Sequence, residues 1–378
     1  MYVSGYIHPK WFESEGDRDL YFLKQVGIDH IDISLDLIDG YEQTGLFERS
    51  DLEALVDRLD KIGLKIERIT ARGRVISDES GNDFDLNKET DNYCRMTEFV
   101  GKTGIPVMSP VPPAHEKSQR LGGVMGSGFF QGQYCGDLID PSMPGWEERT
   151  GRGGYAFPAY RHSEEEAVAV AEHHEMYNQL WDEMIGFYKT LMPVAESAKV
   201  LMAQHGVDPP ITPVRGVPQI LNTVADFERL FREVPSPNNG MTFCVGTRYE
   251  SGENIFEAIK HFGSQNRIFH VHFRNVRGTL PKDGGYEERF IDDGDLNMMD
   301  VVRALDGVGY DRALDYDHVV KTNGDSYIGR QSVAFSAGYI RAEAMARKIL
   351  RGLPLFCDGG RQHGDADKTE PTFSFRLV

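Results

Sequence analysis

The sequence predicts a single (β/α)₈ barrel (a TIM barrel), and three observations indicate it. Strand-like and helix-like segments alternate along most of the 378 residues, as is typical of α/β folds with parallel strands. The alternation yields eight strand–helix pairs, the number that closes such a barrel. Some strand-like segments, such as residues 241–245, are apolar at four of five positions, as expected of a barrel wall covered on both faces.

The expected strands and helices follow one another in regular order. The strands are expected at 2–7, 29–34, 64–69, 105–109, 199–204, 240–245, 267–273 and 312–317. The helices are expected near 17–26, 51–62, 87–102, 164–198, 224–233, 253–263, 296–306 and 333–350. Gly27, Gly63 and Gly104 each fall between a helix and the next strand, where a glycine commonly ends a helix. These joints support one barrel domain over residues 1–350.

Two regions interrupt the alternation. Residues 111–163 are rich in Gly and Pro and are too long for an ordinary connection, so we expect them to be functional. They follow the fourth expected strand, which places this insertion on the catalytic face of a barrel, where it would act as a lid from the strand-four side. The polar C-terminal tail, 351–378, is expected to be irregular.

Composition and charge exclude several classes of protein. The net charge of −18 repels phosphate backbones and anionic lipids, so no nucleic-acid or membrane partner is expected. No apolar run reaches the ~20 residues of a membrane span, and the N-terminal residues do not have the pattern of a signal peptide. The four cysteines are scattered without a CxxC pair, which argues against a zinc ribbon or a disulfide framework. We therefore expect a cytoplasmic protein.

Side chains that can bind a metal end four consecutive expected strands. His205 follows the fifth strand, Cys244 lies in the sixth, His272 in the seventh and Asp317 in the eighth. The C-terminal ends of barrel strands converge on the axis, so these side chains are expected to meet. Imidazole, thiolate and carboxylate together suit a first-row divalent ion such as Mn²⁺, Fe²⁺ or Zn²⁺. Each residue alone also fits a purely structural role, and only their joint placement favours a metal site.

The segments around these residues resemble the mannonate dehydratase family, within the xylose-isomerase-like barrels. The resemblance covers residues 180–345 well and the first hundred residues only in pattern. It is carried by short segments in the expected order, which contain His205, Cys244, His272, Asp293, Asp317, His318 and Arg330. It implies a lyase that dehydrates D-mannonate or a related aldonate to a 2-keto-3-deoxy sugar acid, in glucuronate catabolism. It also implies that His205, Cys244, His272 and Asp317 bind Mn²⁺ or Fe²⁺. A homo-oligomer is expected as well.

The resemblance also implies the proton-transfer residues. His318 would be the main one, and the unperturbed pKa of histidine lies near the operating pH. Neighbours on a regular strand point to opposite sides, so His318 must lie just past the strand if it and Asp317 are both to reach the site. Tyr327 and His270 are the candidates for the second proton transfer, and His270 has the same inward orientation as His272.

Three residues are expected to bind the substrate at the rim. Arg274 lies two residues beyond His272, so its guanidinium could clasp a carboxylate in a fork. A salt bridge to a loop carboxylate is the alternative role for this arginine. Asn275 and His8, which lies just after the first strand, are the other candidates.

The departures from the family pattern concern the substrate pocket more than the metal ligands. Gly206 and Val207 replace a Pro and an Asp, and Tyr316 and Val319 replace a Pro and a Gly. The glutamate expected near Thr70 and the catalytic tyrosine of the family have no aligned counterpart. Two alternatives therefore stay open. One is a xylose-isomerase-like sugar isomerase or epimerase, against which a cysteine ligand counts, and the other is a degenerate barrel that only binds a sugar acid.

Overall fold

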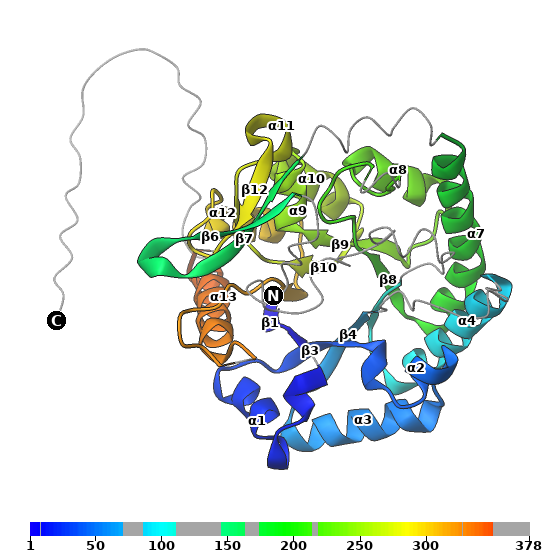
Figure 1. The fold of residues 1–378 in the computed structure, drawn as a ribbon. Coiled ribbons are helices and arrows are strands. Elements are labelled where there is room, and N and C mark those ends of the chain that lie inside the picture. Colours follow the sequence, from blue (N-terminus) through cyan, green and yellow to red (C-terminus); the bar gives the residue numbers. More distant parts are fainter. Residues whose placement is uncertain are drawn as a thin grey trace.

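The computed structural model shows parallel strands in a closed barrel with helices around it, so the expected (β/α)₈ architecture is confirmed (Figure 1). It describes residues 1–7, 9–70, 86–110, 145–162, 174–213, 218–326 and 328–350. The barrel strands are β1 (Tyr2–Ser4), β2 (Tyr6–Ile7), β3 (His30–Ser34), β4 (Lys65–Thr70), β5 (Val107–Ser109), β8 (Leu201–Gln204), β9 (Asn239–Cys244), β10 (Ile268–His272) and β13 (Ala313–Asp315). They pair in the order β1-β13-β10-β9-β8-β5-β4-β3-β2.

The described helices match the expected positions closely, and residues 164–173 of the expected fourth helix lie outside the described residues. The long ones are α1 (Arg18–Gln25), α3 (Arg49–Ile62), α4 (Leu86–Thr103), α7 (His174–Ala198), α8 (Val224–Glu233), α10 (Ile255–Ser264), α12 (Met298–Gly307) and α13 (Arg330–Leu350). The short ones are α2 (Tyr41–Thr44), α9 (Val245–Glu250) and α11 (Leu280–Asp283). Gly27, Gly63 and Gly104 have φ values of 86°, 83° and 79°, so the expected glycine joints are confirmed. Among the described residues, no helix is long and apolar enough to cross a membrane.

The first strand of the barrel is divided into two short strands, β1 and β2, which close the barrel together. β1 pairs with β13, whereas β2 pairs with β3, and Gly5 between them accepts a hydrogen bond from the backbone N–H of Asp32 at 3.0 Å. A Cβ atom at Gly5 would lie only 2.1 Å from the hydroxyl oxygen of Tyr316. Glycine is therefore required where the two ends of the sheet meet, because the tyrosine ring occupies the space of a side chain.

A second, antiparallel sheet lies beside the barrel. It consists of β6 (Trp146–Thr150), β7 (Ala156–Arg161), β11 (Val276–Arg277) and β12 (Gly285–Glu288), in the order β11-β12-β7-β6. β6 and β7 belong to the expected insertion, and they join β12, which follows β10 (Figure 1). The described part of the insertion thus lies against the segment that follows the seventh barrel strand. The rest of the insertion and the tail 351–378 lie outside the described residues, so the lid and the domain bounds stay predictions.

Candidate active site

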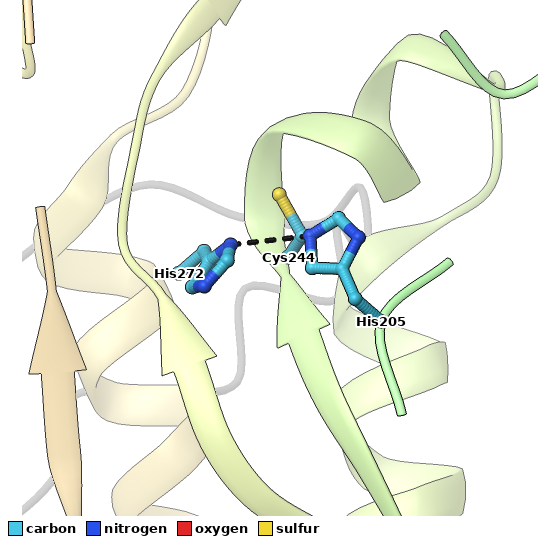
Figure 2. Close-up of side chains that lie close together, drawn as sticks. All are labelled: His205, Cys244 and His272. Carbon is cyan, nitrogen blue, oxygen red and sulfur yellow. Dashed lines mark hydrogen bonds between the residues drawn. The ribbon is translucent and has the colours of Figure 1, made fainter. Parts of the chain in front are cut away.

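Three side chains at the C-terminal ends of neighbouring strands meet inside the barrel mouth (Figure 2). His205 follows β8, Cys244 ends β9 and His272 ends β10, and all three are buried. One ligand atom from each lies within 4.8 Å of the others, and His205 Nε2 is 3.1 Å from His272 Nδ1. The register pairs His272 with Cys244 directly, which sets both side chains at the same height. Thr247 at the start of α9 donates its hydroxyl to Cys244 Sγ at 3.1 Å.

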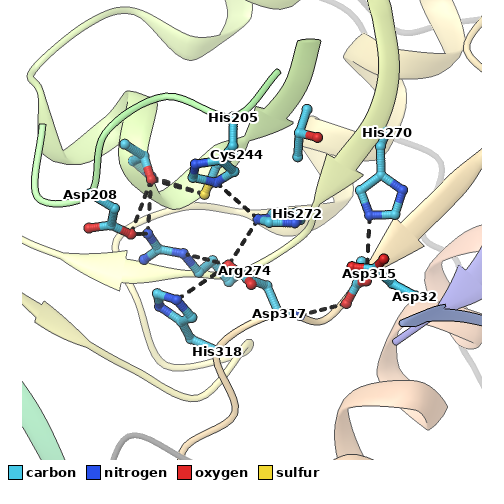
Figure 3. Close-up of polar contacts among 12 residues, drawn as sticks. Asp32, His205, Asp208, Cys244, His270, His272, Arg274, Asp315, Asp317 and His318 are labelled. Atoms are coloured by element: carbon cyan, nitrogen blue, oxygen red, sulfur yellow. Dashed lines mark hydrogen bonds and ion pairs between the residues drawn. The ribbon is translucent and has the colours of Figure 1, made fainter. Parts of the chain in front are cut away.

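Asp317 joins this cluster from the turn after β13. The strand ends at Asp315, and Asp317 has a positive φ of 48°. Its backbone N–H donates to Asp315 Oδ1 at 2.9 Å, which holds the turn. Its Oδ2 lies 3.1 Å from His272 Nδ1 and 3.6 Å from His318 Nε2, so the carboxylate stands between the two rings (Figure 3). His318 therefore does lie past the strand, as the joint approach of Asp317 and His318 requires.

The protonation states of the two histidines and of Asp317 suit a cation. Burial, reinforced by the neighbouring His272, lowers the pKa of His205 to about 3. Burial also lowers the pKa of His272 to about 4, although Asp317 opposes the shift. Burial would raise the pKa of Asp317, but His272, His318 and Arg274 outweigh it and hold that pKa well below its usual range.

The thiol is the exception in this set of donors. Burial raises the pKa of Cys244 to about 12, so it is protonated until a metal displaces the proton. Two neutral imidazoles, an ionised carboxylate and a buried thiol are the donor set of a first-row divalent ion. The residues present therefore fit the metal that the sequence predicts.

His318 is held on its other side by a carboxylate that the sequence analysis did not identify. Its Nδ1 lies 2.8 Å from Glu288 Oε1, which comes from β12. Burial lowers the pKa of His318, but Asp317 and Glu288 outweigh burial and raise it above its ordinary value. His318 is thus a buried histidine whose protonated form two carboxylates stabilise.

Arg274 is not an open clasp for an anion at the rim. Its side chain is 1% exposed, and all three nitrogens face protein carboxylates. Nη1 donates to Glu250 at 2.6 Å and Nη2 donates to Asp208, while Nε is 3.3 Å from Asp317 Oδ2. The alternative role, an internal ion pair, describes this arrangement, because each of the three nitrogens lies within 3.3 Å of a protein carboxylate.

Asn275 is likewise not placed as a substrate contact. Its amide donates to the backbone oxygens of Ile291 and Leu296 at 3.0 and 2.9 Å, and its Oδ1 accepts from the backbone of Val276 and Leu296. The side chain is buried, with its polar atoms engaged in holding the loop before α12. The expected contact of Asn275 with the substrate stays a prediction, and in this structure its side chain holds the loop.

His270 lies inside the barrel, in contact with the His272 ring. Its Nδ1 is 2.9 Å from Glu67 Oε2 and its Nε2 is 3.4 Å from Asp315 Oδ2, so both nitrogens face carboxylates. The two histidine rings have centroids 5.5 Å apart. The geometry thus supports a structural role for His270. The other rim and proton-transfer candidates, His8 and Tyr327, lie outside the described residues.

Arg68 of β4 is a contact of the cluster that the sequence analysis missed. Its Nη2 lies 2.6 Å from Asp32 Oδ2 and 2.8 Å from His272 Nε2, and its Nη1 donates to Thr242 at 2.8 Å. A guanidinium can only donate, so Nε2 of His272 accepts, and the proton of the neutral ring is on Nδ1, the nitrogen that faces His205 and Asp317. The inward parity of Arg68 on β4 was the available signal, because a buried arginine on a barrel strand needs a partner.

Asp208 and Tyr286 were also missed as parts of the site. The Tyr286 hydroxyl donates to Asp208 Oδ1 at 2.9 Å, and both side chains are buried. Asp208, Glu288 and His318 form a second group of potential ligands whose atoms lie within 4.8 Å of one another. The Arg274 guanidinium is bonded to two members of this group, so the two carboxylates there share its one positive charge.

The fold and the buried donor cluster define an enzyme of the TIM-barrel class with its site at the C-terminal ends of the strands. The D-mannonate dehydratase (UxuA) family model matches residues 133–349, more than half of the chain. Mannonate dehydratase 2 of Halalkalibacterium halodurans is 26% identical over 326 residues, which cover 82% of this chain and 89% of that protein. The chain therefore belongs to the D-mannonate dehydratase family, a family of hydro-lyases, and the resemblance seen in the sequence is confirmed.

Solved structures support the fold assignment. Mannonate dehydratase from Streptococcus suis serotype 2 matches with a TM-score of 0.72 at 22% identity, covering 97% of this chain and 99% of that chain. An L-ribulose 3-epimerase matches with a TM-score of 0.56 at 13% identity, covering 95% of this chain and 100% of that chain. Both matches show the shared barrel.

Proposed function

We propose that this chain catalyses the metal-dependent dehydration of a sugar acid, D-mannonate or a closely related aldonate, to a 2-keto-3-deoxy sugar acid. The observation that carries the proposal is the meeting of His205, Cys244 and His272 with Asp317 at the catalytic end of the barrel, in a chain of this family. Mn²⁺ or Fe²⁺ is the proposed metal, and glucuronate catabolism is the proposed context. This enzyme would work in the cytoplasm as a homo-oligomer.

The reaction breaks the C2–H bond and the C3–O bond of the substrate and releases water. A divalent ion held by the four ligands would supply Lewis acidity at the carboxylate and C2 oxygens. His318 is the proposed proton-transfer residue, because its ring lies beside Asp317 and Glu288 stabilises its protonated form. Of the two candidates for the second proton transfer, Tyr327 is preferred, since His270 is enclosed between two carboxylates.

The test is a substrate screen on enzyme that has been stripped of metal and reloaded with Mn²⁺, Fe²⁺ or Zn²⁺. We expect one or a few hexonates to yield a 2-keto-3-deoxy acid, with turnover dependent on the added metal. Conversion of a sugar into its isomer or epimer without loss of water would favour the isomerase alternative. Metal binding without turnover of any hexonate or pentonate would favour the degenerate barrel.

A further inference from the structure

The short strand β12 places one carboxylate against both His318 and Arg274. Glu288 Oε1 is 2.8 Å from His318 Nδ1 and 3.0 Å from Arg274 Nη1, and Oε2 is 3.1 Å from the same Arg274 nitrogen. All three side chains are buried, with Glu288 and Arg274 each 1% exposed. The sequence analysis assigned no role to Glu288, and no strand to the segment that contains it.

This contact determines which nitrogen of His318 faces the metal cluster. An ionised carboxylate only accepts hydrogen bonds, so the proton of a neutral His318 must be on Nδ1. The other nitrogen, Nε2, is then unprotonated and lies on the side of Asp317, at 3.6 Å from its Oδ2. A neutral imidazole with Nε2 unprotonated can take up a proton there, whereas the opposite tautomer cannot.

Arg274 keeps the Glu288 carboxylate in this position. Its guanidinium is also bonded to Glu250 and Asp208, which come from α9 and the segment after β8. Charged hydrogen bonds from a buried arginine to both carboxylate oxygens restrict the rotation of the carboxylate. The orientation of His318 therefore depends on a chain of contacts that begins at Arg274 and passes through Glu288.

We propose that Glu288 is a positioning residue that holds His318 in the Nδ1–H tautomer with Nε2 directed to the metal cluster. This inference rests on the proposed function, in which His318 transfers the proton. Glu288 has a second possible role, which is merely to neutralise the buried charge of Arg274. The two roles make different predictions for a carboxylate that contacts Arg274 but not His318.

Glu250 is the matched control, because its Oε1 is 2.6 Å from the same Arg274 nitrogen. We compare Glu288→Gln with Glu250→Gln in the metal-loaded enzyme. A positioning role predicts a fall in kcat of about 10–100-fold for Glu288→Gln, the usual effect of losing such a supporting partner, with KM and metal content little changed. The loss for Glu250→Gln should be clearly smaller. Equal losses of kcat in the two variants would mean that both residues only neutralise Arg274, and would overturn the proposal.

A second measurement does not depend on turnover. ¹⁵N-histidine NMR of wild-type enzyme loaded with diamagnetic Zn²⁺, at about pH 9 where histidines are ordinarily neutral, reports the tautomer of each ring. The His318 signals are assigned by their absence in His318→Ala. We expect Nδ1–H in wild type and a loss of this preference in Glu288→Gln. An Nε2–H tautomer in wild type would overturn the proposal even in an active enzyme, whereas an inactive enzyme with the Nδ1–H tautomer would contradict only the proposed function.

Discussion

The barrel strands and the antiparallel sheet contribute to one site in different ways. The barrel supplies His205, Cys244 and His272 from regular strand ends, whose alternation and register decide where the side chains point. The antiparallel sheet supplies Glu288 and Tyr286 from β12, which lies in a segment inserted between a barrel strand and its helix. The barrel strands thus position the donors that can hold a cation, while the inserted strand orients the groups around them.

The largest expected effect separates proton transfer from metal binding. His318→Ala should lower kcat by about 10²–10⁴-fold, the usual contribution of a positioned acid or base. Its metal content should stay close to that of wild type, because His205, Cys244, His272 and Asp317 remain. Steady-state kinetics and metal analysis on the same preparation measure both. Loss of metal would show that His318 is itself a ligand, and metal binding would then depend on both regions.

Cys244→Ala tests the ligands that the barrel strands supply. Removing the thiol takes one donor from the cluster directly. Loss of a supporting residue typically lowers metal affinity by about 10–100-fold, and we expect a larger fall here. Competition with a chelator measures the affinity. Cys94, which is half-buried elsewhere, provides Cys94→Ala as the control. Unchanged affinity in Cys244→Ala would remove the thiol from the proposed ligand set.

Arg68→Met tests a contact that comes from the barrel rather than from the inserted sheet. The variant removes the donor to His272 Nε2 and leaves buried Asp32 without its cationic partner, while Thr70 still donates to it. A neutral His272 that binds a metal through Nδ1 carries its proton on Nε2, opposite the Arg68 donor, so removing the guanidinium should raise metal affinity by about 10-fold. Asp32→Asn is the matched control, since it retains a side chain of the same shape and leaves Arg68 beside His272. If both variants bind metal equally well, the contact with His272 does not contribute to the site.

The smallest effect is expected on the outer face of the antiparallel sheet. Arg149 Nη1 donates to Glu287 Oε1 at 2.8 Å, but the arginine side chain is 35% exposed. Arg149→Ala should cost under about 1 kcal/mol in the free energy of unfolding and should leave kcat unchanged. Urea unfolding and kinetics check these values. A large fall in kcat would mean that the whole sheet, and not only the β12 side chains, supports the site.

The barrel part of the site could be predicted from the sequence because it depends only on where each strand ends. Strand ends converge in a barrel, so Cys244 and His272 could be predicted to meet without knowledge of any tertiary contact. Arg274 shows the limit of this reasoning. Its inward parity was correct, but its partners Asp208, Glu250 and Glu288 come from three separate segments, and spacing along the chain does not reveal which charges meet.

The inserted sheet could not be predicted for a related reason. β12 has four residues and β11 has two, too few for a periodic pattern, and β12 pairs with β7, which lies more than a hundred residues earlier. Only the tertiary pairing makes this segment a strand. Glu288 therefore reads, in the sequence, as one of many acidic surface residues.

The positive φ of Asp317 limits how this set of ligands can change during evolution. Left-handed backbone is costly for most side chains, and Asn, Asp, His and Gly adopt it most readily. Cys244 has an ordinary extended φ of −83°, so its backbone accepts exchange for histidine, aspartate or glutamate without strain. At position 317 a glutamate would be disfavoured by the backbone conformation, whether or not its longer side chain could reach the metal. Ligands at the strand ends can thus be exchanged for others that suit a different metal. At the turn, aspartate is favoured over glutamate as the carboxylate ligand.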